Sequence, residues 1–137
     1  MTALAKARAK SFERWTHHLM PLAVGNKAWT GGIAGIDLST GKVEPSHVEN
    51  DLFIFGTFDE DVDATTVEKQ VNCDFGMEIQ VELLANDGTI TAAMLGQLAY
   101  AVDDQTVGAS GTGTSIVGRI WEVKSTGLVA VQLLLAR

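Results

Sequence analysis

From Pro21 onward the chain consists of short apolar runs separated by turns that contain glycine. The clearest run, residues 77–83, alternates apolar side chains with Glu and Gln, which is the period of a strand with one solvent-facing side. Residues 22–137 contain no helical pattern long enough to connect two parallel strands. This spacing constrains the fold more than any other feature, and it predicts an all-β sandwich or a small barrel.

The positions of the expected strands and turns follow from the same spacing. Apolar runs predict strands at residues 33–38, 52–58, 77–83, 98–102, 115–124 and 128–135. Gly, Asn, Asp, Ser and Thr predict turns at residues 39–42, 86–88, 103–104 and 125–127. Residues 91–95 have the composition of a single helical turn. The last two strands form the clearest hairpin, in a register that the sequence leaves open.

Length and composition exclude several classes of protein. The chain has 137 residues, 46% of them hydrophobic, which suits one domain with a real core. No run reaches the roughly 18 apolar residues that span a bilayer, and no apolar block follows the first basic residues, so we expect neither a membrane span nor a secretory signal. The single cysteine, Cys73, excludes an internal disulfide and a four-cysteine zinc site.

Charge divides the chain into two parts. Residues 1–18 hold four basic residues against one acidic residue, a net charge of +3, whereas the remainder holds six basic and sixteen acidic residues, a net charge of −10. The overall charge of −7 argues against a general nucleic-acid binder. We therefore divide the chain into a basic N-terminal arm, residues 1–20, and an acidic β-rich body, residues 21–137.

The arm is amphipathic at a helical period, so we expect an N-terminal amphipathic helix that Pro21 ends. Three roles stay open for it: docking on a partner or a neighbouring subunit, lying on a membrane surface, or packing on its own body. Docking is the interpretation we carry forward, with no membrane partner. The candidate contact residues are Lys6, Arg8, Lys10, Phe12, Arg14, Trp15, Leu19 and, outside the arm, Trp29.

Three motifs that suggest chemistry have plainer explanations. The Gly-rich residues 108–115 lack the lysine of a phosphate-binding loop and precede a strand, so we expect a flexible hairpin loop. The acidic residues 59–63 lack the glycine of a calcium loop, so we expect a solvated loop. Adjacent Asp103 and Asp104 suit a turn better than a carboxylate pair for acid–base catalysis.

The remaining reactive side chains suggest neither a catalytic nor a metal site. His17 and His18 would diverge by about 100° on a helix, which is poor geometry for binding one metal ion. We expect His47 at the surface and Cys73 as a buried or half-buried thiol. Trp29 and Trp121 suit a core or an interface, and a sugar-binding platform is the alternative. The sequence therefore predicts a protein that is not an enzyme and binds no cofactor or metal.

Residues from about 31 to 135 resemble the capsid decoration, or cement, proteins of bacteriophages. An Asp…Thr-Gly…Pro element at residues 37–45 precedes a β-run at 53–58 that contains a glycine and leads into acidic residues up to Asp63. The more specific stretch is Leu-Gly-Gln-Leu-Ala-Tyr-Ala-Val-Asp-Asp-Gln-Thr-Val at 95–107, followed by Val-Gly-Arg-Ile-Trp-Glu-Val at 117–123. Residues 1–20 have no counterpart in the family pattern.

The resemblance implies a non-enzymatic virion protein that binds the outer surface of the assembled capsid and stabilises it. It also implies a small β-barrel or β-tulip body, a homotrimer at local symmetry axes, the major capsid protein as partner, and assembly in the host cytoplasm. Two alternatives stay open: another virion component, such as a tail-tube or head–tail joining subunit, or a carbohydrate-binding β-domain that uses Trp29 or Trp121.

Overall fold

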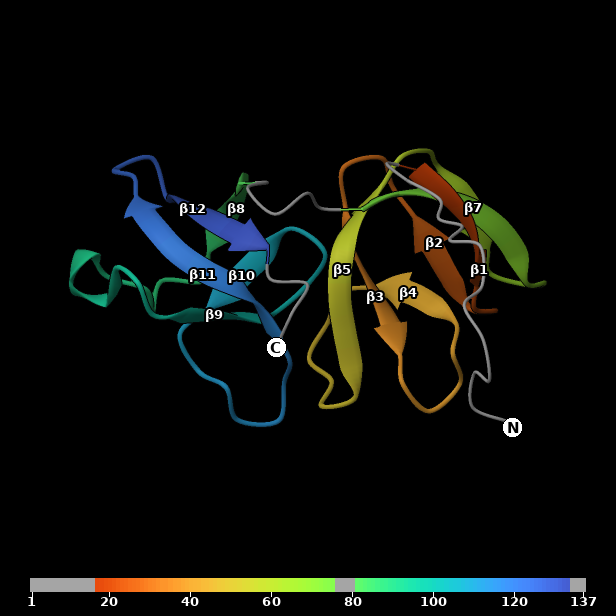
Figure 1. The fold of residues 1–137 in the computed structure, drawn as a ribbon, viewed down its shortest axis with the longest axis horizontal. Coiled ribbons are helices and arrows are strands. Elements are labelled where there is room, and N and C mark those ends of the chain that lie inside the picture. The colour runs from red at the N-terminus through yellow and green to blue at the C-terminus, as the bar shows by residue number, and fades with distance from the viewer. Residues whose placement is uncertain (1–16, 76–80, 134–137) are drawn as a thin grey trace, which may run out of the picture.

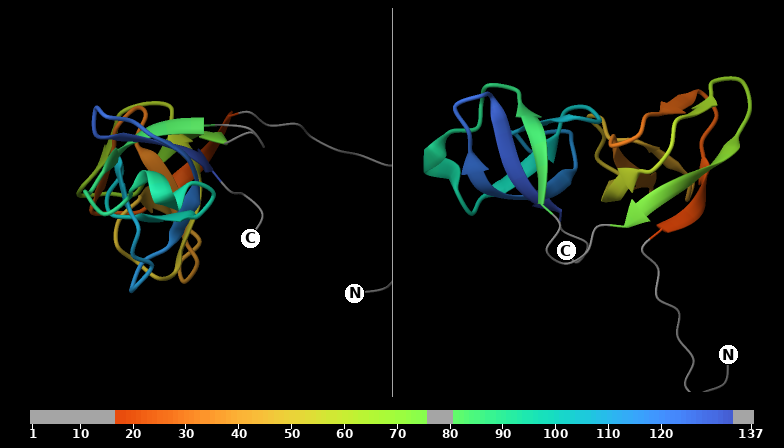
Figure 2. Two further views of the ribbon diagram at one scale, coloured as in Figure 1. Left: turned by 90° about the vertical axis from the view of Figure 1, so that its left-hand side faces the viewer. Right: turned by 90° about the horizontal axis from the view of Figure 1, so that it is seen from above.

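A computed structural model describes residues 17–75 and 81–133, which form twelve strands and one short 3-10 helix. Figure 1 shows two β-barrels side by side, and the view from above in Figure 2 separates them in the same way. The prediction of a mainly β fold is confirmed, with barrels as its form. Within the described residues, no helix has the length and apolar character that crossing a membrane requires.

The first barrel closes in the strand order β1-β4-β3-β5-β7. Its strands are β1 (His17–Leu22), β3 (Ile33–Asp37), β4 (Val43–Pro45), β5 (Leu52–Phe58) and β7 (Lys69–Phe75). Two shorter strands, β2 (Asn26–Ala28) and β6 (Val62–Ala64), pair with each other as a separate sheet. The core of the first barrel is a buried cluster that contains Leu22, Phe55, Phe58 and Val71.

The second barrel closes in the order β10-β8-β12-β11-β9. Its strands are β8 (Val81–Asn86), β9 (Leu98–Ala101), β10 (Thr106–Gly108), β11 (Ile116–Val123) and β12 (Leu128–Leu133). The expected helical turn is present as a 3-10 helix over Ala92–Met94. The predicted hairpin of the last two strands is also present, with Ile120 opposite Val131 and a bulge at Trp121. The predicted strand segments 77–80 and 134–135 lie outside the described residues.

The two barrels have the same topology. In each barrel the first strand pairs in parallel with the third, β1 with β4 and β8 with β10, and every other pairing is antiparallel. Both barrels then continue from the third strand through the second and fourth to the fifth, which pairs with the first. The described part of the chain is therefore a tandem repeat of one five-stranded design.

The repeat extends to single residues at the bulge between the second and fourth strands. In the first barrel Ala34 lies opposite Gly56 and Gly35 opposite Ile54; in the second, Ala99 lies opposite Gly118 and Tyr100 opposite Ile116. The glycines that open these strands also correspond. Gly31 and Gly96 both have positive φ, and each donates its N–H over 2.8 Å to the carbonyl of a buried residue, Phe58 or Ile120.

A buried interface joins the barrels. Ile33, Leu52 and Ile54 of the first barrel belong to the core cluster of the second. The Ile33 N–H donates to the Asp104 carbonyl over 2.8 Å. The Ser115 hydroxyl accepts the Leu52 N–H at 3.2 Å and donates to the Glu49 carbonyl. Because apolar packing and hydrogen bonds both cross this boundary, the barrels dock through a continuous core rather than through a linker alone.

The predicted helix over residues 1–20 is wrong at its C-terminal end, while residues 1–16 lie outside the described residues. Residues 17–22 form β1, which pairs along its length with β7. Exposure alternates along β1 as in a strand: His17 and Leu19 are exposed, and Leu22 is buried. On its other side β1 pairs with β4 only at Leu22, so most of that side is an open edge. Pro21 is tolerated there because no partner strand needs its missing N–H. Pairing with a distant strand overrides the local helical pattern.

The predicted hairpin loop at residues 108–115 is also a wrong assignment. The loop joins β10 to β11, which lie on opposite sides of β9 rather than next to each other. It therefore crosses over β9, where a Cβ built at Gly111 would lie 2.7 Å from the Tyr100 ring. The Thr114 hydroxyl donates to the Ala101 carbonyl at 2.7 Å and holds the crossing in place. Glycine is needed here because the backbone passes directly over an aromatic ring.

Candidate functional site

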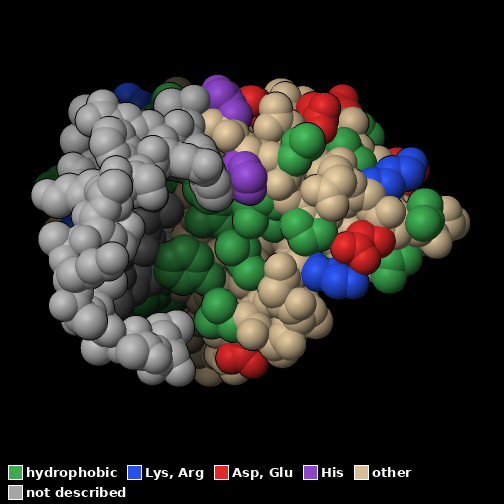
Figure 3. Space-filling model, turned by 45° about the vertical axis from the view of Figure 1, so that its right-hand side comes forward, with side chains coloured by type: hydrophobic (Ala, Val, Ile, Leu, Met, Phe, Trp, Pro, Cys, Tyr) green, Lys and Arg blue, Asp and Glu red, His purple; other side chains and the backbone are tan. Residues whose placement is uncertain are grey.

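The structure places only two of the predicted contact residues. Leu19 lies on the outward face of β1 and is 57% exposed, and Trp29 lies in the loop after β2 and is 56% exposed. Lys6, Arg8, Lys10, Phe12, Arg14 and Trp15 lie outside the described residues. The surface on the first-barrel side, shown in Figure 3, mixes hydrophobic, acidic, basic and histidine side chains.

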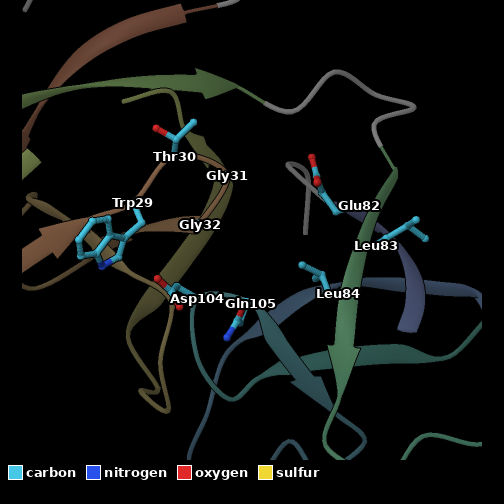
Figure 4. Close-up of a pocket in the computed structure, with 9 residues that line it drawn as sticks. All are labelled: Trp29, Thr30, Gly31, Gly32, Glu82, Leu83, Leu84, Asp104 and Gln105. Carbon is cyan, nitrogen blue, oxygen red and sulfur yellow. The ribbon is translucent and has the colours of Figure 1, made fainter. Parts of the chain in front are cut away.

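Trp29 borders a cleft of about 570 Å³ between the two barrels. The cleft is lined by the loop of residues 29–32, by residues 82–84 of β8, and by the turn at Asp104 and Gln105. In Figure 4, Trp29 comes from the first barrel and Asp104 from the β9–β10 turn. Glu82 and Leu84 come from β8 on the other side of the cleft. The Leu83 side chain points away from the cleft. The nine lining residues thus offer one exposed aromatic ring among polar groups.

Hydrogen bonds shape the loop that carries Trp29. The Gly32 N–H donates to the Trp29 carbonyl at 2.8 Å, and the N–H and hydroxyl of Thr30 both donate to Asp61 Oδ1 at 2.8 Å. A Cβ built at Gly32 would lie 3.2 Å from a carboxylate oxygen of Asp104. The loop therefore lies tightly against the β9–β10 turn.

Asp104 is the cleft residue with a shifted pKa. Burial raises the pKa of Asp104 above its ordinary value of 3.8, and the neighbouring Asp103 carboxylate raises it further. The other polar side chains in the lining are those of Thr30, Glu82 and Gln105.

The acidic loop after β5 is exposed, as predicted, and its carboxylates have separate hydrogen-bond partners. Glu60 accepts the Asn72 N–H at 2.9 Å, and Asp63 accepts the N–H and hydroxyl of Thr65. Hydrogen bonds from Thr30 lower the pKa of Asp61. These three carboxylates therefore organise the loop itself, and they do not converge on one point.

A second candidate surface is the outward face of the second barrel. Val81 and Leu83 on β8 and Trp121 on β11 are each about half exposed. Strand β12 lies between β8 and β11, and its Ala130 pairs with Leu83. The Trp121 Nε1–H donates to Gln132 Oε1 at 2.8 Å, which fixes the orientation of the indole. The alternation along residues 77–83 predicted that Glu82 faces solvent and that Val81 and Leu83 face the core. The structure shows the opposite for the two apolar residues, because Val81 and Leu83 are about half exposed.

The most specific part of the family resemblance maps to structural positions of the second barrel. Gly96 has positive φ, and Arg119 donates to the Gly96 carbonyl. Asp103 accepts the Gln105 N–H at 2.9 Å within the turn before β10. A Cβ built at Gly118 would lie 1.9 Å from the Gln132 carbonyl oxygen, so only glycine fits there. These residues therefore specify the structure of the second barrel.

Comparison with models of protein families, with curated proteins and with solved structures finds no match to this chain.

Proposed function

We propose that this protein is a bacteriophage virion component that binds the outer surface of the assembled capsid and stabilises it. The observation that carries the proposal is the ordered resemblance of residues 95–123 to capsid decoration proteins, in which Gly96, Gly118 and Asp103 have definite roles in the second barrel. The resemblance brings the major capsid protein as partner and a homotrimer as the assembled form.

Two surfaces suit such a role. The outward face of the second barrel presents Val81, Leu83 and Trp121, and half-exposed aromatic and aliphatic side chains on a rigid sheet are typical anchors of a protein interface. The basic residues of the arm can contact acidic patches on a neighbouring subunit or on the shell, since the body is acidic overall. Contacts repeated by symmetry multiply, so each one can be weak.

The experiment is co-sedimentation of the purified chain with expanded, empty capsids of the phage that encodes it. We expect saturable binding and a higher temperature of capsid disruption. Trp121→Ala combined with Leu83→Ala should weaken binding at least tenfold, because truncating two interface anchors removes more than about 1.4 kcal/mol. The matched control is Val67→Ala, an exposed apolar residue in the loop before β7. Failure of the wild-type chain to bind capsids would refute the proposal.

The carbohydrate-binding alternative has one observation in its favour, the exposed Trp29 ring beside the polar groups of the cleft. It predicts glycan binding that Trp29→Ala abolishes and that Trp121→Ala leaves unchanged. Capsid binding with the opposite dependence on the two tryptophans supports the decoration role instead. Electron microscopy of labelled virions separates a shell position from a tail or head–tail position.

A further inference from the structure

Three metal-ligating side chains meet on the outer surface of the first barrel. His17, Asp59 and Asp74 each offer one donor atom, and these donor atoms all lie within 4.8 Å of one another. The His17 Nδ1 lies 2.6 Å from Asp59 Oδ2. We infer that this triplet is a binding site for a divalent transition-metal ion such as Zn²⁺. The inference is independent of the proposed capsid role.

The pairing of the strands explains why these side chains converge. His17 of β1 lies directly opposite Asp74 of β7, and Asp74 lies opposite Thr57 of β5 on the other side. Asp59 follows β5 immediately and donates its N–H to the Asn72 carbonyl, which keeps it beside β7. Paired residues on adjacent strands project to the same face, so three neighbouring chain segments each supply one ligand.

The barrel itself does not require these residues. Because the two barrels share one topology, the positions of His17, Asp74 and Asp59 correspond to Val81, Gln132 and Trp121 in the second barrel. Val81 lies opposite Gln132 as His17 lies opposite Asp74, and Trp121 follows Ile120 as Asp59 follows Phe58. The second barrel closes without an acid or a histidine at any of the three positions, so the shared topology does not itself require these side chains.

The donor set determines the class of ion. One imidazole nitrogen with two carboxylate oxygens suits Zn²⁺, Co²⁺ or Mn²⁺ better than Ca²⁺ or Mg²⁺, which favour oxygen ligands throughout. Zn–N and Zn–O bonds of about 2.0–2.1 Å place tetrahedral donors about 3.4 Å apart. On binding, His17 Nδ1 and Asp59 Oδ2 must therefore move apart from 2.6 Å, and donor atoms that lie farther apart than this must approach each other. Rotation of the carboxylates supplies such movements. The His17 and Asp59 side chains are 48% and 36% exposed, which leaves room for water in the remaining positions.

The test is titration of the full-length chain with Zn²⁺ in a calorimeter and with Co²⁺ followed by its visible absorption. We expect one ion per chain, and at least a tenfold loss of affinity in His17→Ala, Asp59→Asn and Asp74→Asn. The matched control is His47→Ala, because His47 also lies beside a carboxylate, 3.4 Å from Glu44, but belongs to no such triplet among the described residues. We expect the control to bind as tightly as the wild type.

Zn²⁺ should also tie β1 to the rest of the first barrel. At a concentration 100-fold above the dissociation constant, we expect Zn²⁺ to raise the melting temperature of the wild type by about 5–10 °C and that of Asp74→Asn much less. Circular dichroism verifies that each variant folds before titration. The inference is overturned if the wild type takes up no ion with one-to-one stoichiometry, or if the triplet variants bind Zn²⁺ as tightly as His47→Ala.

Discussion

Gly118→Ala should destabilise the protein more than the same change at Gly32, Gly35, Gly108 or Gly111, because a Cβ at Gly118 meets backbone at the shortest distance. Gly118 does not have a positive φ, so alanine is allowed by the backbone and only space decides. The new Cβ would lie 1.9 Å from the Gln132 carbonyl oxygen, where ordinary contacts begin at 3.4 Å. The β11 and β12 backbones must therefore separate by about 1.5 Å at the point where Gly118 pairs with Leu133.

The magnitude follows from what that separation breaks. Overpacking contributes about 1–3 kcal/mol, and weakening two ladder hydrogen bonds in a buried sheet adds about 1–3 kcal/mol, so we expect a loss of about 4 kcal/mol in the free energy of unfolding. With an unfolding entropy of about 2.1 cal/mol/K per residue over the 137 residues, this loss corresponds to a fall of about 14 °C in melting temperature.

Thermal unfolding followed by circular dichroism measures the effect, with Gly127→Ala as control. Gly127 has a φ of +85° and no atom within 4 Å of a built Cβ, so its substitution carries only the backbone strain of about 1–2 kcal/mol, or about 5 °C. If Gly118→Ala is no less stable than Gly127→Ala, the close approach of the two strands is not the reason for the glycine.

Two further predictions concern titratable groups. Burial raises the pKa of Asp104, so its ionisation opposes folding. The penalty is absent below the ordinary pKa of 3.8, grows as pH rises from there to the folded pKa, and is constant above it. Asp104→Asn should therefore melt higher than the wild type at pH 7, with a difference that shrinks at low pH; a difference independent of pH contradicts this assignment. Burial raises the pKa of Cys73 to about 12, so a thiol reagent at pH 8 should modify it only after unfolding; rapid modification of the native protein would show that the thiol is accessible.

Much of the β architecture was predictable because its causes are local. The turn at residues 39–42 is present, with Gly41 at positive φ, and so is the turn at 86–88, where Asn86 accepts the Gly88 N–H. Strand β5 occupies the predicted residues 52–58. Side chains that favour a turn, and glycines that permit its backbone angles, act within a few residues, so composition alone locates them.

Segments whose structure depends on distant partners were predicted less well. Residues 17–20 carry an amphipathic pattern at helical spacing, yet they form a strand because β7, some fifty residues away, supplies the hydrogen bonds. The Gly-rich segment 108–115 is compatible with a hairpin, yet it crosses β9 because β10 and β11 both pair with that strand. In neither case does the local sequence contain the information that decides between the two structures.

The chain by itself determined its class: a β protein with short strands, glycine turns, a buried thiol and a basic start on an acidic body. These properties depend on side-chain chemistry and on spacing over a few residues. Only the tertiary structure decided that there are two barrels of one topology, that Trp29 borders a cleft between them, and that His17, Asp59 and Asp74 meet on one face. Each of these depends on which strands pair and in which register, and that choice is made by the energy of the whole barrel rather than by any single segment.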